Sequence, residues 1–196
     1  MGVELDTFGP AAPAPVERRL LMSDQEIEVG LPLFETLPNR VAVIRQENLS
    51  TDPTYGGLME FLNIDVSNEK PEDMGGRGTM MKRIDVDARY GRYDITFTAP
   101  FSNHFHRKSW EVIQVQEGEA TIKVGGVVSG QEKDAVLEGG FAQEIHIISG
   151  DVVIIPPDTP QGIELFTDSL ATKVLMSPPF DRANDSFKFT LADKSA

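Results

Sequence analysis

Short segments rich in β-branched and aromatic residues follow one another along the middle of the chain, with turn-forming residues between them. The pattern predicts strands at residues 79–86, 93–98, 110–115, 120–124, 145–148, 152–155, 163–166 and 171–176. Glu117-Gly118-Glu119 is expected to turn the third of these strands into the fourth as a hairpin. Many short strands with closely spaced turn signals are typical of an all-β sandwich or barrel.

Two of the three histidines in the chain, His104 and His106, lie one residue apart within this region. Residues i and i+2 of an extended segment point to the same face, so the two imidazoles can converge on one point. Glu111 follows after a short polar link and shares a strand face with Ile113 and Val115 in a period-2 pattern. Two imidazoles and a carboxylate form a ligand set that Fe, Mn, Ni, Co or Zn accepts. The H-x-H pair alone is a weak signal, so the interpretation depends on the sequence downstream.

The spacing of these residues resembles the first motif of the cupin superfamily. Four residues separate His106 from Glu111, and six separate Glu111 from Gly118, as in that motif. Thr98 occupies the place of the motif's leading glycine. The resemblance covers roughly residues 80–178, about half of the chain.

A second stretch resembles the second cupin motif, with Gly150, five residues and Pro156, and then Gln161. Gln161 stands where the family usually has a third histidine. Asp158 replaces a glycine, a mild change because Asp tolerates the left-handed backbone conformation that a turn glycine supplies. Two motifs in the right order imply the double-stranded β-helix, the jelly-roll barrel of cupins.

We therefore expect an all-β chain in which residues 79–180 form a single cupin barrel. Residues 1–78 are expected to form an N-terminal arm and extension that packs on the barrel, and residues 181–196 a C-terminal tail. Within the extension, residues 40–45 read as a strand, whereas residues 54–66 fit either a helix or a strand. Residues 67–78 read as a loop because of their glycines and Pro71.

The resemblance implies that His104, His106 and Glu111 bind a divalent metal, with Fe(II) the first expectation and Mn, Ni or Zn as alternatives. A glutamine oxygen is a poorer donor than imidazole, so Gln161 is expected to be a weak ligand or to hydrogen-bond bound water or substrate. Two histidines and one carboxylate suffice for the facial triad of non-haem Fe(II) oxygenases. His146 is a rival third ligand, although its position favours a surface histidine, and loss of the metal is a further alternative.

The resulting hypothesis is a metal-dependent enzyme, a non-haem Fe(II)/Mn(II) dioxygenase acting on a small aromatic or hydroxy/keto acid that chelates the metal through adjacent oxygens. Glu111 would serve as a catalytic base if it does not bind the metal. Substrate contacts are expected from Arg107, Trp110 and Arg83. The alternatives are a non-catalytic cupin that binds a small molecule, and a metal-assisted or metal-free isomerase or lyase.

Charge and composition limit the partners. With 18 Lys and Arg against 31 Asp and Glu, the net charge of -13 argues against binding nucleic acid or an anionic membrane. Cysteine is absent, which excludes disulfides, a thiolate nucleophile and cysteine-bound zinc. No secretory signal or bilayer-spanning apolar run is evident, so the protein is expected to be cytoplasmic. A homodimer is expected because cupins commonly pair.

Overall fold

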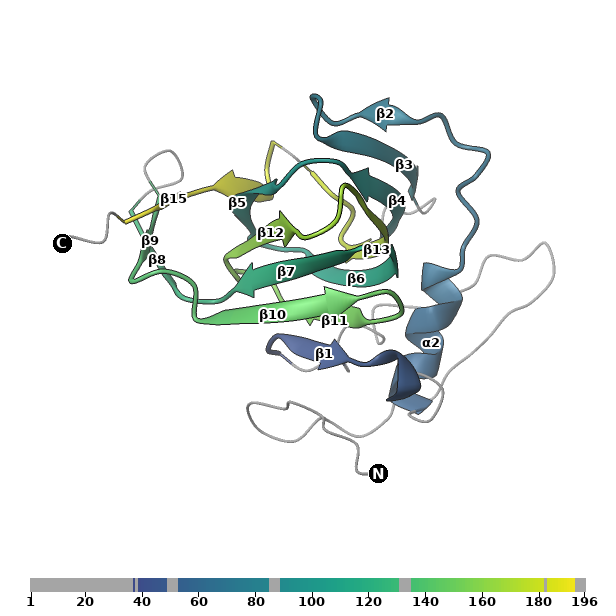
Figure 1. The fold of residues 1–196 in the computed structure, drawn as a ribbon, viewed down its shortest axis with the longest axis horizontal. Coiled ribbons are helices and arrows are strands. Elements are labelled where there is room, and N and C mark those ends of the chain that lie inside the picture. Colours follow the sequence, from purple (N-terminus) through teal and green to yellow (C-terminus); the bar gives the residue numbers. More distant parts are fainter. Residues whose placement is uncertain are drawn as a thin grey trace.

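Nested pairs of antiparallel strands form the centre of the computed structural model, which describes residues 37, 39–48, 53–84, 89–130, 135–181 and 183–192 (Figure 1). The innermost pair joins β7 (Glu119–Val124) to β10 (Gln143–Ile148). Outside it lie β6 (Trp110–Glu117) with β11 (Val152–Ile155), β5 (Phe101–His106) with β12 (Gln161–Leu165), and β4 (Gly91–Phe97) with β13 (Leu170–Ser177). This nesting is the double-stranded β-helix, so the predicted jelly-roll barrel is confirmed.

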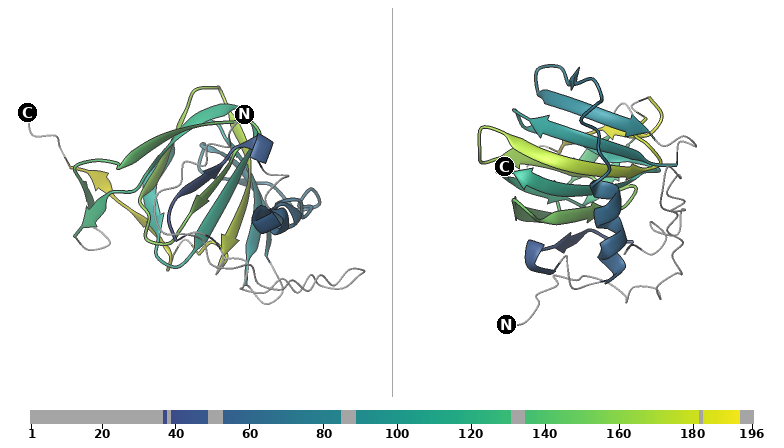
Figure 2. Two further views of the ribbon diagram at one scale, coloured as in Figure 1. Left: turned by 90° about the horizontal axis from the view of Figure 1, so that it is seen from below. Right: turned by 90° about the vertical axis from the view of Figure 1, so that its right-hand side faces the viewer.

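The paired strands are divided between two sheets that pack face to face (Figure 2). One sheet has the order β1-β11-β6-β13-β4-β3-β2, with β1 at Ala42–Ile44, β2 at Glu72–Asp73 and β3 at Gly78–Ile84. The other has the order β10-β7-β12-β5-β14, with β14 at Ser186–Lys188. A small third sheet contains β8 (Val127–Ser129), β9 (Val136–Glu138) and β15 (Thr190–Leu191).

Side chains alternate along β6, so this strand contributes to two apolar clusters, one on each face of the large sheet. Ile113 and Val115 pack in the main core between the two sheets, and Glu111 lies on this same inner face. Trp110 and Val112 point the other way, into a second apolar cluster outside the large sheet. The predicted face shared by Glu111, Ile113 and Val115 is therefore confirmed, and it turns a carboxylate toward the barrel interior.

Helix α2 (Pro53–Leu62) overlaps most of the segment at residues 54–66 that fitted either a helix or a strand, and it follows the short 3-10 helix η1 (Gln46–Asn48). Leu58, Phe61 and Leu62 are almost fully buried in the second cluster, against the outer face of the large sheet (Figure 2). The predicted strand at residues 40–45 is β1, at the edge of the same sheet. The described part of the extension is thus packed onto the barrel, while residues 1–36 of the expected arm lie outside the described residues.

Strands on both sides of the expected barrel range also belong to its sheets. β1 precedes residue 79, and β14 lies inside the segment expected as a C-terminal tail. β14 pairs with β5, and Phe187 and Phe189 pack with Phe105 in a third apolar cluster. The segment expected to be a tail is therefore part of the barrel, because its aromatic side chains pack against the barrel strands.

Two motif residues occupy turns that restrict residue type. Gly118, between β6 and β7, has a φ of 94°, and an added Cβ would lie 2.4 Å from the carbonyl oxygen of Ser169. Glycine is therefore required there by both backbone conformation and space. Asp158 has a φ of 58°, the left-handed conformation predicted for it.

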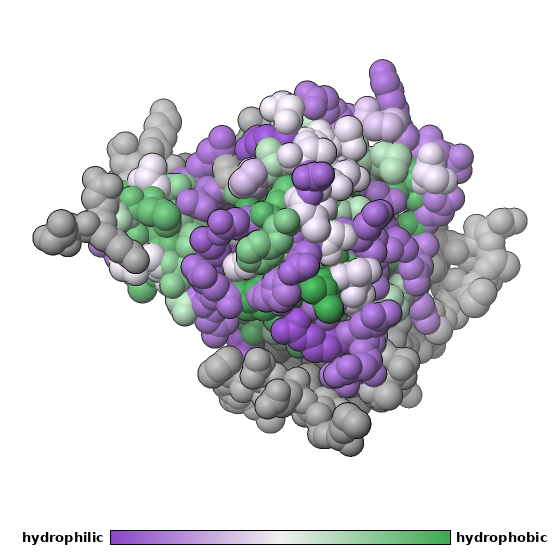
Figure 3. Space-filling model, in the orientation of Figure 1, coloured by the Kyte–Doolittle hydropathy of each residue, from purple (hydrophilic) through white to green (hydrophobic). Residues whose placement is uncertain are grey.

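Much of the visible surface is polar, and apolar side chains are seen at one end of the molecule and in smaller groups near its middle (Figure 3). Apolar side chains gather over the small sheet of β8, β9 and β15 (Figure 3), where Val127 and Leu191 are exposed. Among the described residues, helix length and apolar character nowhere reach what a bilayer crossing requires.

Candidate metal centre

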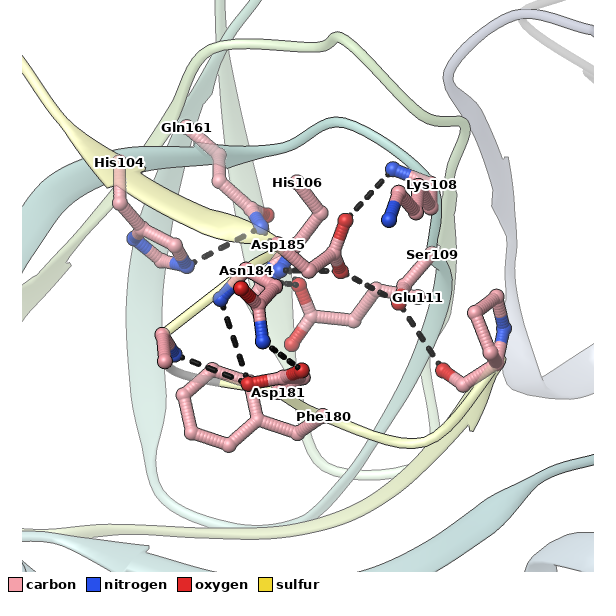
Figure 4. Close-up of polar contacts among 12 residues, drawn as sticks. His104, His106, Lys108, Ser109, Glu111, Gln161, Phe180, Asp181, Asn184 and Asp185 are labelled. Atoms are coloured by element: carbon pink, nitrogen blue, oxygen red, sulfur yellow. Dashed lines mark hydrogen bonds and ion pairs between the residues drawn. The ribbon is translucent and has the colours of Figure 1, made fainter. Parts of the chain in front are cut away.

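Strands from the two sheets bring His104, His106 and Glu111 together inside the barrel (Figure 4). The histidines lie on β5 and the glutamate on β6, and one ligand atom from each residue lies within 4.8 Å of the others. His106 Nε2 is 3.7 Å from Glu111 Oε2. Both histidines are buried, and the glutamate side chain is 12% exposed. The three residues predicted to bind a metal therefore form one cluster.

A β-bulge in β5 places an aromatic side chain next to this cluster. His104 lies opposite Gln161 and Phe101 opposite Ile163, so three positions on β5 span two on β12. The extra residue turns Phe101 toward the same side as His104, and their rings meet edge to face with centroids 5.0 Å apart. Phe180 packs against His106 in a similar way at 5.8 Å. The two imidazoles, which also meet each other edge to face, are thus flanked by one phenylalanine ring on each side.

Gln161 contacts two of the three expected ligands. Its Nε2 donates a hydrogen bond to Glu111 Oε2 at 2.5 Å and lies 3.3 Å from His104 Nε2. The side chain is buried on the inner face of β12, near Ile163 and Leu165 of the main core. The nitrogen and oxygen of a carboxamide exchange places by a half-turn, so Gln161 can offer this space either a donor or a ligand oxygen.

A second buried carboxylate, Asp185, lies on the far side of His106 (Figure 4). Its Oδ2 is 3.3 Å from His106 Nδ1, and it accepts hydrogen bonds from the Lys108 backbone N–H at 2.6 Å and from Ser109 Oγ at 2.5 Å. Sequence reasoning missed Asp185, because its position depends on pairing between β14 and β5 rather than on a local pattern.

Burial sets the protonation preferences of the cluster. It raises the pKa of the Glu111 carboxyl, an effect that the charge on His104 and the hydrogen bond from Gln161 oppose and Asp185 reinforces. Burial also lowers the pKa of His106, and the nearby carboxylate of Asp185 offsets part of this change. The metal-free site therefore favours a neutral His106, which is the form that binds metals.

The main core next to the cluster is largely apolar. Tyr93 is 1% exposed there, and burial raises the pKa of its phenol to about 12. Its hydroxyl accepts a hydrogen bond from the Phe180 backbone N–H at 2.8 Å. Phe97 meets Phe101 edge to face at 5.3 Å. The other described residues of this core cluster are hydrocarbon or methionine side chains.

The residues predicted to contact substrate lie elsewhere. Arg107 is about half exposed, 3.5 Å from Asp158 and stacked over the ring of Phe105. Trp110 packs in the outer cluster against α2, and Arg83 is exposed on β3. None of these three side chains lies at the metal cluster. Their positions therefore give no support to the predicted role in binding substrate.

His146, the rival ligand, lies on the outer face of β10. Its Nε2 is 2.6 Å from Glu119 Oε1, and 54% of its side chain is exposed. Ile147, its neighbour, points inward and is fully buried. His146 is thus a surface histidine, as its place on the strand predicted.

Comparison with known proteins finds no matching family profile and no matching curated protein. Among solved structures, the fold is similar to that of Pac13 from Streptomyces, described as a nucleoside dehydratase, with 13% identity and a TM-score of 0.48 over 64% of this chain and 90% of that one. It is also similar to oxalate decarboxylase from Lactobacillus farciminis, with 16% identity and a TM-score of 0.45 over 62% and 33%. A vicilin from Solanum melongena matches with 15% identity and a TM-score of 0.45 over 59% and 32%.

Proposed function

We propose that this chain, whose jelly-roll barrel brings together residues of two motifs that resemble those of cupins, is a metal-dependent enzyme acting on a small molecule inside the barrel. The observation that carries the proposal is the convergence of His104, His106 and Glu111 within 4.8 Å in the buried interior. The nitrogen and carboxylate donors of this set suit Fe(II), Mn(II), Ni(II) or Zn(II).

The charges around the cluster favour a bound cation. Glu111 and Asp185 are two carboxylates in one buried region, and over the described ranges their ion pairs involve His106 but no lysine or arginine. Buried charges are costly unless they are paired or coordinate a metal. A divalent cation bound by Glu111 would neutralise this region and hold the carboxylate ionised, against the upward shift of its pKa in the metal-free site.

The two histidines and one carboxylate correspond to the facial triad of non-haem Fe(II) oxygenases, and we favour a dioxygenase-type reaction. When bound, Fe(II) or Mn(II) would supply open positions for dioxygen and for adjacent oxygen atoms of an aromatic or hydroxy/keto acid. Phe101 and Phe180 would exclude water from these positions and pack against the substrate's hydrocarbon part. Gln161 would donate a hydrogen bond to a substrate oxygen or to Glu111.

A second candidate, acid–base chemistry of the isomerase or lyase type without metal, is favoured by the environment of Glu111. The carboxyl is buried, its pKa is raised, and Gln161 orients it by a 2.5 Å hydrogen bond. A raised pKa brings a carboxylic acid closer to the range in which it exchanges protons near neutral pH. In this case Glu111 would transfer the proton and the histidines would hold the substrate.

Substrate screening under controlled metal and oxygen distinguishes the two candidates. The protein is loaded anaerobically with Fe(II) or Mn(II) and mixed with catechols, hydroxy acids and keto acids, while an oxygen electrode and mass spectrometry follow turnover. The dioxygenase proposal predicts oxygen uptake that chelation and His104→Ala abolish, whereas Gln116→His, a change on the exposed part of β6, leaves it intact. Product formation without oxygen and with excess chelator would contradict it and support the acid–base alternative.

A further inference from the structure

The two ring nitrogens of His106 face different partners. Nε2 points toward the metal cluster, 3.7 Å from Glu111 Oε2, and Nδ1 lies 3.3 Å from Asp185 Oδ2. Nδ1 is buried and makes no hydrogen bond within the described part of the chain. The carboxylate of Asp185 is the polar group that lies next to it. A neutral imidazole carries its proton on one nitrogen only, so the neighbour of Nδ1 decides which nitrogen is free to bind a metal.

We propose that Asp185 is a positioning residue that keeps the proton of His106 on Nδ1 and leaves the Nε2 lone pair directed at the metal. An ionised carboxylate accepts hydrogen bonds and cannot donate one, so it stabilises the Nδ1–H form of a neighbouring imidazole. The proposal rests on the metal-dependent function proposed above, and it assigns part of the site to the C-terminal segment.

The position of Asp185 is determined by the loop that joins the two ligand-bearing strands. Its carboxylate accepts hydrogen bonds from the Lys108 N–H and from Ser109 Oγ, and its backbone carbonyl accepts one from the Arg107 N–H at 3.1 Å. These three residues connect β5, which carries His106, to β6, which carries Glu111. The contacts therefore hold Asp185 in a fixed position relative to both ligands.

The hydrogen bonds from Lys108 and Ser109 would by themselves account for a structural role of the Asp185 carboxylate. Its position 3.3 Å from His106 Nδ1 is a separate observation, and the proposal depends on it. The same segment supplies Phe180, whose ring packs against the His106 imidazole. β14, which begins directly after Asp185, pairs with β5 at His106. The C-terminal segment thus surrounds His106 with a carboxylate, an aromatic ring and a paired strand.

The test uses Asp185→Asn, which keeps the shape of the side chain but replaces an acceptor by an amide that can donate to Nδ1. Asp181→Asn is the matched control, because Asp181 lies in the same segment and caps the N–H groups of Ala183 and Asn184 without contacting His106. Nitrogen–proton correlation spectra of the metal-free proteins report the tautomer of each histidine ring. Binding titrations with Mn(II) and Zn(II) report affinity.

We expect His106 to carry its proton on Nδ1 in the wild type and on Nε2 in Asp185→Asn. Mn(II) and Zn(II) should bind the variant about 10–100-fold more weakly, the range seen when a partner of a metal-binding histidine is removed. Asp181→Asn should match the wild type in both measurements. An unchanged tautomer in Asp185→Asn, even with a lower melting temperature, would overturn the proposal and leave Asp185 a purely structural role. Absence of metal binding in the wild type would contradict the proposed function, while the tautomer measurement would still decide the role of Asp185.

Discussion

Gln161 is the residue in which this site departs most from the usual cupin pattern. It takes the place of a third imidazole, yet it points into the cluster and contacts both His104 and Glu111. With a carboxamide in this position, a metal bound here would have three strong protein donors and an additional open or weakly held position. The substitution therefore suits chemistry in which the substrate itself binds the metal.

Changing Gln161→His should tighten metal binding, because imidazole is a stronger donor than a carboxamide oxygen. We expect the dissociation constant for Mn(II) or Zn(II) to fall by about tenfold or more, comparable to other changes around metal-bound histidines. Competition with a chromogenic chelator measures this change, and Gln116→His on the exposed part of β6 is the control. Equal affinities in a folded Gln161→His protein would show that this side chain does not reach the metal.

The phenol of Tyr93, whose pKa is raised by burial and by the nearby Glu111 carboxylate, gives a pH-dependent prediction for a residue outside the proposed ligand set. Tyr93→Phe leaves the Phe180 N–H without its acceptor and should cost about 1 kcal/mol in the free energy of unfolding at pH 8. The folded-state pKa of about 12 lies above the ordinary value of 10.0 for a tyrosine, so the phenol's contribution is complete below pH 10 and is lost as the pH rises toward 12. Urea denaturation from pH 8 to pH 11 should therefore show the wild-type advantage shrinking. A difference that stays constant over this range would contradict the assigned burial of the phenol.

The three expected ligands could be predicted from sequence because their spacing is local. His104 and His106 share a face by strand geometry, and the motif spacing links Glu111 to them. Asp185 could not be predicted in this way, because it reaches His106 only after β14 pairs with β5. The position of Trp110 could not be predicted either. Strand periodicity identifies the two faces of β6, but it does not show that α2 covers the outer face, where Trp110 packs.

At the level of elements, most of the long strands were predictable, whereas the helix, β5 and the short strands β2, β8, β9, β14 and β15 were not. Strands with β-branched residues and glycine turns carry a strong local signal, and the observed β4, β6, β7, β11 and β13 lie where the sequence predicts them. α2 contains Gly56 and Gly57, which are poor helix formers, so its own sequence is ambiguous. Its packing against the outer face of the large sheet selects the helix.

Leu62→Ala tests whether this helix is an integral part of the barrel. Leu62 is fully buried between α2 and the sheet, and truncating a buried leucine to alanine typically costs 2–5 kcal/mol of stability, so we expect a loss of about 3 kcal/mol. Chemical denaturation measures the loss, and Glu60→Ala, an exposed change on the same helix, should alter stability by less than about 0.5 kcal/mol. A Leu62→Ala protein as stable as the Glu60→Ala control would mean that α2 contributes little to the folded state.

At the scale of the whole molecule, an acidic chain encloses a site in which, among the described residues, the two carboxylates form ion pairs with His106 and not with lysine or arginine. The whole chain has a net charge of -13, and within the barrel Glu111 and Asp185 bring two carboxylates into one buried region (Figure 4). A divalent metal is the simplest partner that balances the buried carboxylates, and a cation that binds only the folded state also stabilises it. The predicted homodimer and cytoplasmic location stay predictions, because neither follows from the structure of one chain.

The metal content of the purified protein tests the central claim most directly. Plasma mass spectrometry is applied to the wild type and to a His104→Ala/His106→Ala variant, both as isolated and after incubation with Fe(II), Mn(II), Ni(II) or Zn(II) and desalting. We predict close to one equivalent of a single divalent metal per chain in the wild type and almost none in the variant, with circular dichroism confirming that both are folded. Wild-type protein that retains no metal after incubation, or a variant that retains as much as the wild type, would contradict a metal centre at His104, His106 and Glu111.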